Sequence, residues 1–159
     1  IYVAPEHADG ARPALSGWLG HAAPFDFDIA YRPAPGIERM RVGTPPILQL
    51  AALDAALDVW DIADIADVRT QALALGDRFI AGVEAACPDL TLATPREHAM
   101  RGSQVSFRHP QGYAIMQALI AQGVIGDFRA PDILRFGITP LYLGPDDIDA
   151  AVAVLARVM

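Results

Sequence analysis

Residues 123–143 constrain the fold more than any other part of the chain. Their centre, 132–139, is apolar, β-branched or aromatic, and Pro140 ends the run. Alternation along a strand places every second side chain on the same face, and here one face is wholly apolar: Leu134, Phe136 and Ile138. The pattern predicts a short strand with that face packed on a core.

The other face of this predicted strand carries a single arginine. Arg135 is followed two residues later by Gly137, which leaves space beside the guanidinium. An arginine fixed on a strand with room next to it suits bidentate binding of a carboxylate or a phosphate. An ordinary ion pair of Arg135 with Asp127 or Asp132 is the alternative, and the pattern alone favours it at least as well.

The remaining pattern predicts helices packed on a small, largely antiparallel sheet, an α/β chain with an α+β small domain. Thr44 is expected to be the N-cap of a helix that continues to about Trp60. A second helix is expected to start near Asp61 and to reach about Cys87, so we place the boundary between two structural units there: 1–60 and 61–159. Further expected elements are strands at 1–4, 90–93 and 104–108, and helices at 112–122 and from 145 onward.

Apolar positions predict the inward faces of these helices. They are expected to be Leu50, Leu53, Leu57 and Trp60 in the first helix; Ile65, Val68, Ala72, Leu75 and Phe79 in the second; Ile115, Met116, Leu119 and Ile120 in the third; and Ile148, Val152, Leu155 and Met159 in the last. Gly123 is expected to cap the third helix at its C-terminus.

Composition excludes several classes of function. The net charge of -7 and the lack of any basic run argue against nucleic-acid or anionic-membrane binding, and no apolar run is long enough to span a membrane. Cys87 is the single cysteine, so no disulfide forms within the chain, and a reduced, cytoplasmic setting fits. His98 and His109 have no second ligand at metal-binding spacing, so no metal site is expected. The first residues read as the middle of a strand, which suggests that the chain begins inside a larger protein.

Three segments carry a family resemblance. They are Gly126-Asp-Phe-Arg-Ala-Pro-Asp-Ile-Leu-Arg-Phe-Gly137 followed by Thr139-Pro-Leu-Tyr142, Ser16-Gly-Trp-Leu-Gly-His21, and Val42-Gly-Thr-Pro-Pro-Ile47. With them the chain closely resembles the C-terminal portion of kynureninases, which depend on pyridoxal 5'-phosphate (PLP). The resemblance implies an aspartate-aminotransferase-like (fold-type I) structure, a homodimer, and hydrolysis of L-kynurenine or 3-hydroxy-L-kynurenine in tryptophan catabolism and NAD biosynthesis. It also implies that residues 1–60 are the end of a large PLP-binding domain and that 61–159 form the small C-terminal domain.

The resemblance also suggests site residues. It implies that Trp18 donates its indole N–H to the PLP phosphate, that Thr44 lies at the same cofactor site, and that Arg135 binds the substrate α-carboxylate. Without it, a tryptophan packed under its loop and a threonine that only caps a helix are the better interpretations. His21 either lines the site or, as is commoner, caps a turn.

All twelve cationic side chains are arginine, and the chain contains no lysine. A PLP enzyme of this kind holds its cofactor as a Schiff base on a lysine amine. We therefore expect no catalytic residue in these 159 residues and no activity from them alone. Two alternatives stay open: a non-catalytic fragment that folds and self-associates, and a related PLP-dependent lyase or aminotransferase.

Overall fold

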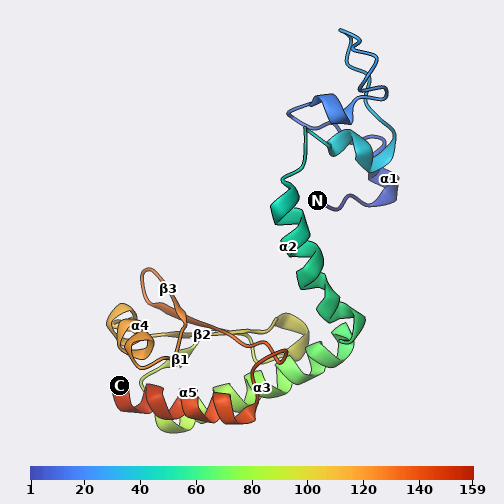
Figure 1. Cartoon of the computed structure of the whole chain (residues 1–159). Coiled ribbons are helices and arrows are strands. Elements are labelled where there is room, and N and C mark those ends of the chain that lie inside the picture. The colour runs from blue at the N-terminus through green and yellow to red at the C-terminus, as the bar shows by residue number, and fades with distance from the viewer. The chain divides into compact units, whose positions relative to one another are not determined.

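The computed structural model describes all residues, 1–159, and they form two compact units, Ile1–Asp58 and Val59–Met159 (Figure 1). We call them unit 1 and unit 2 and describe each by itself. The division lies close to the boundary that the sequence predicts between residues 60 and 61.

Unit 1 contains short helices and long loops. Its elements are α1 (Pro5–Ala8), the 3₁₀ helices η1 (Trp18–Gly20) and η2 (Gly36–Met40), and α2 (Ile47–Leu57). The predicted strand at residues 1–4 is wrong, because these residues pair with no other strand and Pro5, pre-set for a first helical turn, opens α1 instead. Arg39 links distant loops of this unit by donating to the Ala34 carbonyl at 3.1 Å and by pairing with Asp9 at 3.2 Å.

The helix α2 begins at Ile47, two residues later than predicted. Pro46 occupies the N-cap position, no side chain caps the helix, and Thr44 lies outside it in a bend. The reason is steric, because a residue that precedes a proline is driven out of the helical region, and Thr44 and Pro45 both precede prolines. The N-cap prediction for Thr44 is therefore wrong.

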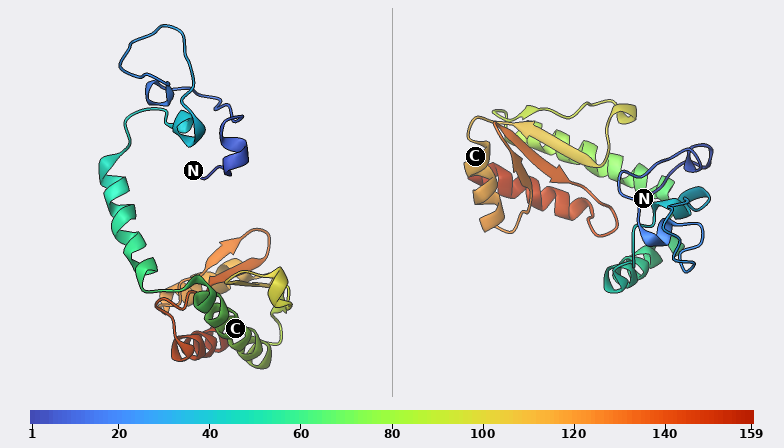
Figure 2. Two further views of the ribbon diagram at one scale, coloured as in Figure 1. Left: turned by 90° about the vertical axis from the view of Figure 1, so that its right-hand side faces the viewer. Right: turned by 90° about the horizontal axis from the view of Figure 1, so that it is seen from above.

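Unit 2 packs three α-helices on a small antiparallel sheet, as predicted, but the sheet has four strands where the sequence indicated three. The strands are β1 (Thr91–Leu92), β2 (Gln104–Arg108), β3 (Asp127–Arg129) and β4 (Ile133–Gly137), and they pair antiparallel in the order β1-β2-β4-β3. The helices are α3 (Ile65–Ala86), α4 (Gly112–Ala121) and α5 (Pro145–Val158), and short 3₁₀ helices lie at η3 (Asp58–Asp61) and η4 (His98–Met100). Figure 2 shows α3 and α5 side by side against the sheet.

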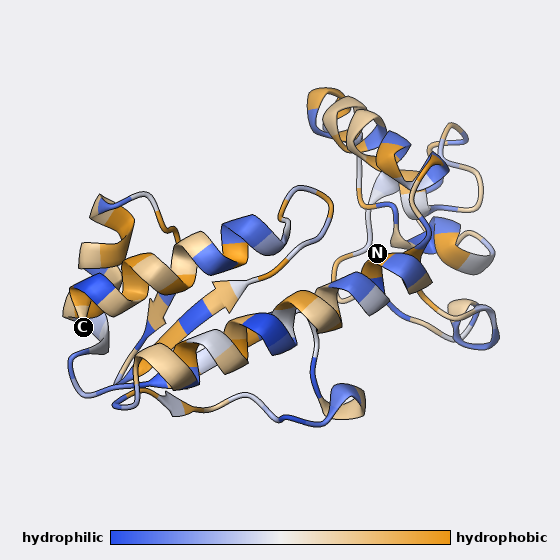
Figure 3. Ribbon diagram, turned by 90° about the horizontal axis from the view of Figure 1, so that it is seen from below, coloured by the Kyte–Doolittle hydropathy of each residue, from blue (hydrophilic) through white to orange (hydrophobic).

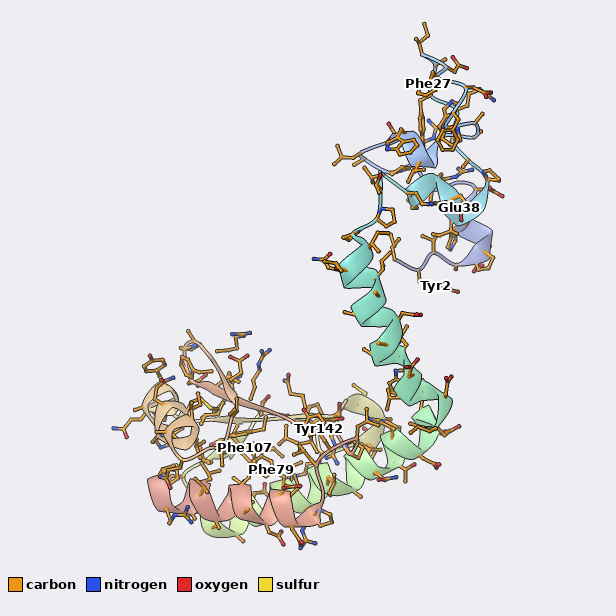
Figure 4. The ribbon with its side chains drawn as sticks, in the orientation of Figure 1. Tyr2, Phe27, Glu38, Phe79, Phe107 and Tyr142 are labelled. Carbon is orange, nitrogen blue, oxygen red and sulfur yellow. The ribbon has the colours of Figure 1, made fainter.

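The core of unit 2 lies between these helices and the apolar face of the sheet. Phe79 of α3 packs edge-on against Phe107 of β2 and Phe136 of β4, with ring centroids 6.0 and 5.0 Å apart (Figure 4). The strand residues predicted to face inward are buried: Leu134, Phe136 and Ile138. Along these helices hydrophobic and hydrophilic residues alternate, as packing on one side requires (Figure 3).

The predicted helix end at Gly123 is confirmed in unit 2, but several predicted inward-facing side chains are not. Gly123 caps α4 as predicted, with a positive φ of 86° and a hydrogen bond from its N–H to the Ile120 carbonyl. Four side chains of unit 2 predicted to face inward are instead exposed: Trp60, Ile65, Ile120 and Met159. In unit 1 the predicted inward face of α2 is exposed as well, at Leu50, Leu53 and Leu57. Ile65 and Met159 lie in the end turns of their helices, where the neighbouring elements no longer cover them. The short strand β3 was not predicted.

Candidate functional site

A close approach between two backbone segments builds the first candidate site, within unit 1. A Cβ atom on Gly17 would lie 1.5 Å from the carbonyl oxygen of Val42, so only glycine allows the two segments to meet as they do. This contact brings Trp18 beside Gly43, where a Cβ atom would lie 3.9 Å from the indole Nε1. Thr44 follows Gly43, so the two sequence-predicted cofactor residues lie on segments that meet at Gly17 and Val42.

The indole of Trp18 is available to a ligand. The residue is 49% exposed, its ring packs edge-on against Phe25 at 5.7 Å between centroids, and no acceptor in the chain takes its N–H. Thr44 is exposed and its hydroxyl caps no helix. Trp18, Gly43 and Thr44, which we call the cradle, thus combine an indole N–H, a bare backbone and a hydroxyl in neighbouring positions, and donors of these kinds suit an anionic oxygen group such as a phosphate.

His21 closes the loop next to this cradle. Its Nδ1 accepts from the Ala23 N–H at 2.9 Å, and its Nε2 donates to the Ala30 carbonyl at 3.1 Å. Both ring nitrogens are therefore occupied by backbone groups, and the side chain is buried. Of the two predicted roles for His21, the structure supports the turn-capping one.

A hollow of about 450 Å³ lies beside Trp18, and sequence reasoning missed it. Its apolar lining comes mainly from the loop that His21 closes: Phe27, Ile29 and Tyr31. Phe27 has a positive φ of 51° and, like Ile29, is largely exposed. The alternating apolar residues at positions 25, 27 and 29 could have indicated this hollow. The three nearby prolines instead led us to interpret the segment as an irregular loop.

The second candidate site lies on the sheet of unit 2, around Arg135. In the strand register, Arg135 of β4 faces Ser106 of β2 on one side and Asp127 of β3 on the other. Its Nη2 donates to the Asp127 carboxylate, and the side chain is 32% exposed. Its Nε is buried without an acceptor. The predicted ion-pair alternative is thus realised with Asp127, whereas Asp132 lies 3.5 Å from Arg108.

Asp127 is held by two arginines. Besides Arg135, Arg129 donates to it through Nη1 at 3.1 Å. The hydrogen bond from Arg135 is the main cause that lowers the pKa of Asp127 below its ordinary value, so this carboxyl is ionised at neutral pH. The unpredicted strand β3 therefore contributes a fixed negative charge beside the predicted arginine.

The structure offers little other chemistry. Cys87 is buried, and burial raises the pKa of its thiol, which makes it a poor nucleophile. No three histidine, cysteine, aspartate or glutamate side chains gather as metal ligands do, and no helix is long and apolar enough to cross a membrane.

Comparison with known proteins identifies the family. The family model described as the kynureninase C-terminal domain matches residues 68–155, which include Arg135. The chain belongs to the kynureninase C-terminal domain family. It is also 53% identical to a kynureninase from Deinococcus radiodurans and 48% identical to one from Pseudomonas fluorescens. Both matches cover the whole chain, including Trp18 and Thr44, but only 39% of the relative.

Solved structures place the fold among PLP-dependent enzymes. A cysteine desulfurase from Thermococcus onnurineus NA1 superposes with a TM-score of 0.80 at 17% identity, over 98% of this chain and 41% of its own. The cystine C-S lyase C-DES, solved with its product cysteine persulfide, superposes with a TM-score of 0.79 at 25% identity, over 98% and 41%. A second C-DES structure carries glycine linked to its PLP cofactor. The fold-type I architecture predicted from the sequence is confirmed.

Proposed function

We propose that this chain is the C-terminal portion of a kynureninase that hydrolyses L-kynurenine or 3-hydroxy-L-kynurenine to the corresponding anthranilate and L-alanine. The observation that carries the proposal is identity of 48–53% with kynureninases along the entire chain. Because the chain spans about two fifths of the length of those relatives, the activity belongs to a longer protein. We assign residues 1–60 to the end of its large cofactor-binding domain and 61–159 to its small domain, and we expect a cytoplasmic homodimer.

In this proposal the cradle of unit 1 binds the phosphate of PLP. Trp18 donates its free indole N–H, Thr44 donates its hydroxyl, and the bare backbone of Gly43 lets the phosphate approach both. When bound, PLP supplies the electron sink for cleavage of a carbon–carbon bond. The chain has no lysine to anchor the cofactor covalently, so that group must come from another part of the longer protein, and the 159 residues alone should be inactive.

Arg135 binds the α-carboxylate of the substrate. Its guanidinium is held on a sheet whose other face is buried in the core, so the cation is fixed before the substrate arrives. An arginine held in this way orients the substrate by a charge-assisted hydrogen bond rather than by bulk attraction alone.

Two alternatives have weaker support. A related PLP lyase would share the fold, but the lyase C-DES is only 25% identical, about half the identity of the kynureninases. A non-catalytic fragment that self-associates is favoured by the missing lysine and by the exposed apolar side of α2, where Ile47, Leu50, Leu53 and Leu57 line an open groove.

The test uses the longer protein that contains these residues, purified with PLP and supplied with L-kynurenine. Anthranilate fluorescence should appear, and Arg135→Gln should lower kcat/KM about 100-fold, mainly through a higher KM, because a charged hydrogen bond to the substrate is lost. Arg157→Gln is the matched control, since Arg157 lies exposed on α5 and contacts only Gln122 and a helix carbonyl, and it should change nothing. Equal turnover by the wild type and Arg135→Gln, or no turnover at all, would contradict the proposal.

A further inference from the structure

Asp127 stands between two arginines at the place where a ligand would meet Arg135. Its Oδ2 lies 2.9 Å from Nη2 of Arg129 and accepts from Nη2 of Arg135. The three side chains carry two positive charges and one negative charge, which leaves a local balance of one positive charge. The neighbouring pair of Arg108 and Asp132 is neutral as a whole.

The surroundings of Arg135 leave only one nitrogen of its guanidinium group fully available to a ligand. Nε is buried without an acceptor and Nη2 is engaged by Asp127, so Nη1 is the nitrogen that is both unpaired and not buried. A single carboxylate can bind Nη1 and share Nη2. A second anionic group on the same ligand would have to lie near the Asp127 carboxylate, where like charges repel.

We propose that Asp127 is a specificity-determining residue that restricts Arg135 to ligands with one negative charge. The Asp127 carboxylate neutralises one of the two positive charges of Arg129 and Arg135. It also fixes the Arg135 guanidinium through a cross-strand ion pair. The inference rests on the proposed function for Arg135 as a carboxylate-binding residue, and it deepens that function by setting the charge class of the ligand.

The test measures charge selectivity rather than turnover. The ¹⁵N-labelled 159-residue chain is titrated at neutral pH with acetate, a monoanion, and with succinate, a dianion, while the Nε–H and backbone resonances of Arg135 are followed. For the wild type we expect weak binding of acetate and several-fold weaker binding of succinate, because the second carboxylate of succinate is repelled by Asp127. In Asp127→Asn we expect succinate affinity to rise about tenfold and acetate affinity about threefold, because the removed charge repels the dianion more strongly.

Two further variants separate this role from a structural one. Asp127→Glu keeps the charge and should restore the selectivity of the wild type. Asp149→Asn is the matched control, because Asp149 is also an exposed carboxylate paired with an arginine, Arg78, but lies on α5; it should leave the selectivity unchanged.

Two results of the titrations would overturn the inference about Asp127. An equal change for acetate and succinate in Asp127→Asn, or no response of Arg135 to either anion in any variant, overturns the inference. Failure of the longer protein to cleave kynurenine would instead contradict the proposed function while leaving the measured selectivity of Arg135 intact, so the two failures are distinguishable.

Discussion

Unit 1 and unit 2 are built in opposite ways. Unit 2 buries large side chains from its three α-helices and from β2 and β4, and Phe107, Leu119 and Leu134 are wholly inaccessible to solvent. Unit 1 buries only small or polar residues: Ala8, Gly20, His21 and Ala34. The same contrast separates the helices α2 and α3, since α3 has six buried positions and α2 has none.

The contrast shows where the stability of the chain resides. An apolar core of the size found in unit 2 is the main favourable term in folding, whereas the loops of unit 1 rely on backbone contacts and a few polar side chains such as Arg39 and His21. The cradle that we propose to bind phosphate, with Trp18 and Thr44, thus lies on the less stable unit, and Arg135 lies on the more stable one. We expect the two units to respond separately to substitutions.

The largest effect is expected in the core of unit 2. Phe107→Ala should lower the free energy of unfolding by about 3–5 kcal/mol, because it leaves a cavity among packed aromatic rings. Leu53→Ala, on the exposed side of α2, should change it by less than about 0.5 kcal/mol. Urea unfolding monitored by circular dichroism measures both. Similar decreases in the free energy of unfolding for the two variants would contradict the contrast between the units.

A smaller and more local effect is expected at Gly17. Gly17→Ala would force its Cβ into the Val42 carbonyl, so the segments that hold Trp18 and Gly43 must separate. We expect NMR resonances of unit 1 to shift or broaden while those of α3, α5 and the sheet stay in place. Gly10→Ala is the control, because its Cβ would make only an ordinary contact of 3.8 Å with the His7 carbonyl. Changes spread equally over both units would contradict the account.

The smallest effect concerns the acid stability of unit 2. Desolvation raises the pKa of Asp77, but hydrogen bonds from Arg101 and His98 outweigh it and hold the pKa below the ordinary value of 3.8. Because the folded pKa is lowered, the ionised carboxylate stabilises the fold fully above the unfolded value, and this stabilisation is lost as the pH falls through the lower folded value.

Asp77→Asn tests this pH dependence. Its destabilisation relative to the wild type should be largest near neutral pH, where Arg101, whose side chain is only 2% exposed, loses its ionic partner. The difference should shrink as the pH falls below 3.8, as thermal unfolding at a series of pH values can show. A difference that stays constant with pH would mean that Asp77 acts only through packing.

Much of unit 2 could be predicted because its signals are local. The alternation at Leu134, Phe136 and Ile138 and the glycine at 123 determine the strand and the helix end with no knowledge of distant residues. The strand β3 was not predicted, because three residues are too few to show a periodic pattern and its extended shape depends on pairing with β4. Asp127 was named from the sequence as one of two possible partners of Arg135, and only the register decides between Asp127 and Asp132.

Unit 1 was harder to predict, for a different physical reason. Its contacts are close approaches of backbone between residues about 25 positions apart, such as Gly17 against Val42, and they leave no periodic pattern in the sequence. The family resemblance suggested Trp18 and Thr44, but their proximity comes from the structure. At Thr44 the good capping residue was outweighed by the two prolines that follow it.

Hydrogen–deuterium exchange of the 159-residue chain tests the central contrast most directly. The account predicts strong protection of amides in α3, α5, β2 and β4, and rapid exchange throughout residues 1–46 and in α2, since α2 has no buried side chain to hold its hydrogen bonds closed. Protection of α2 equal to that of α3 would contradict the account.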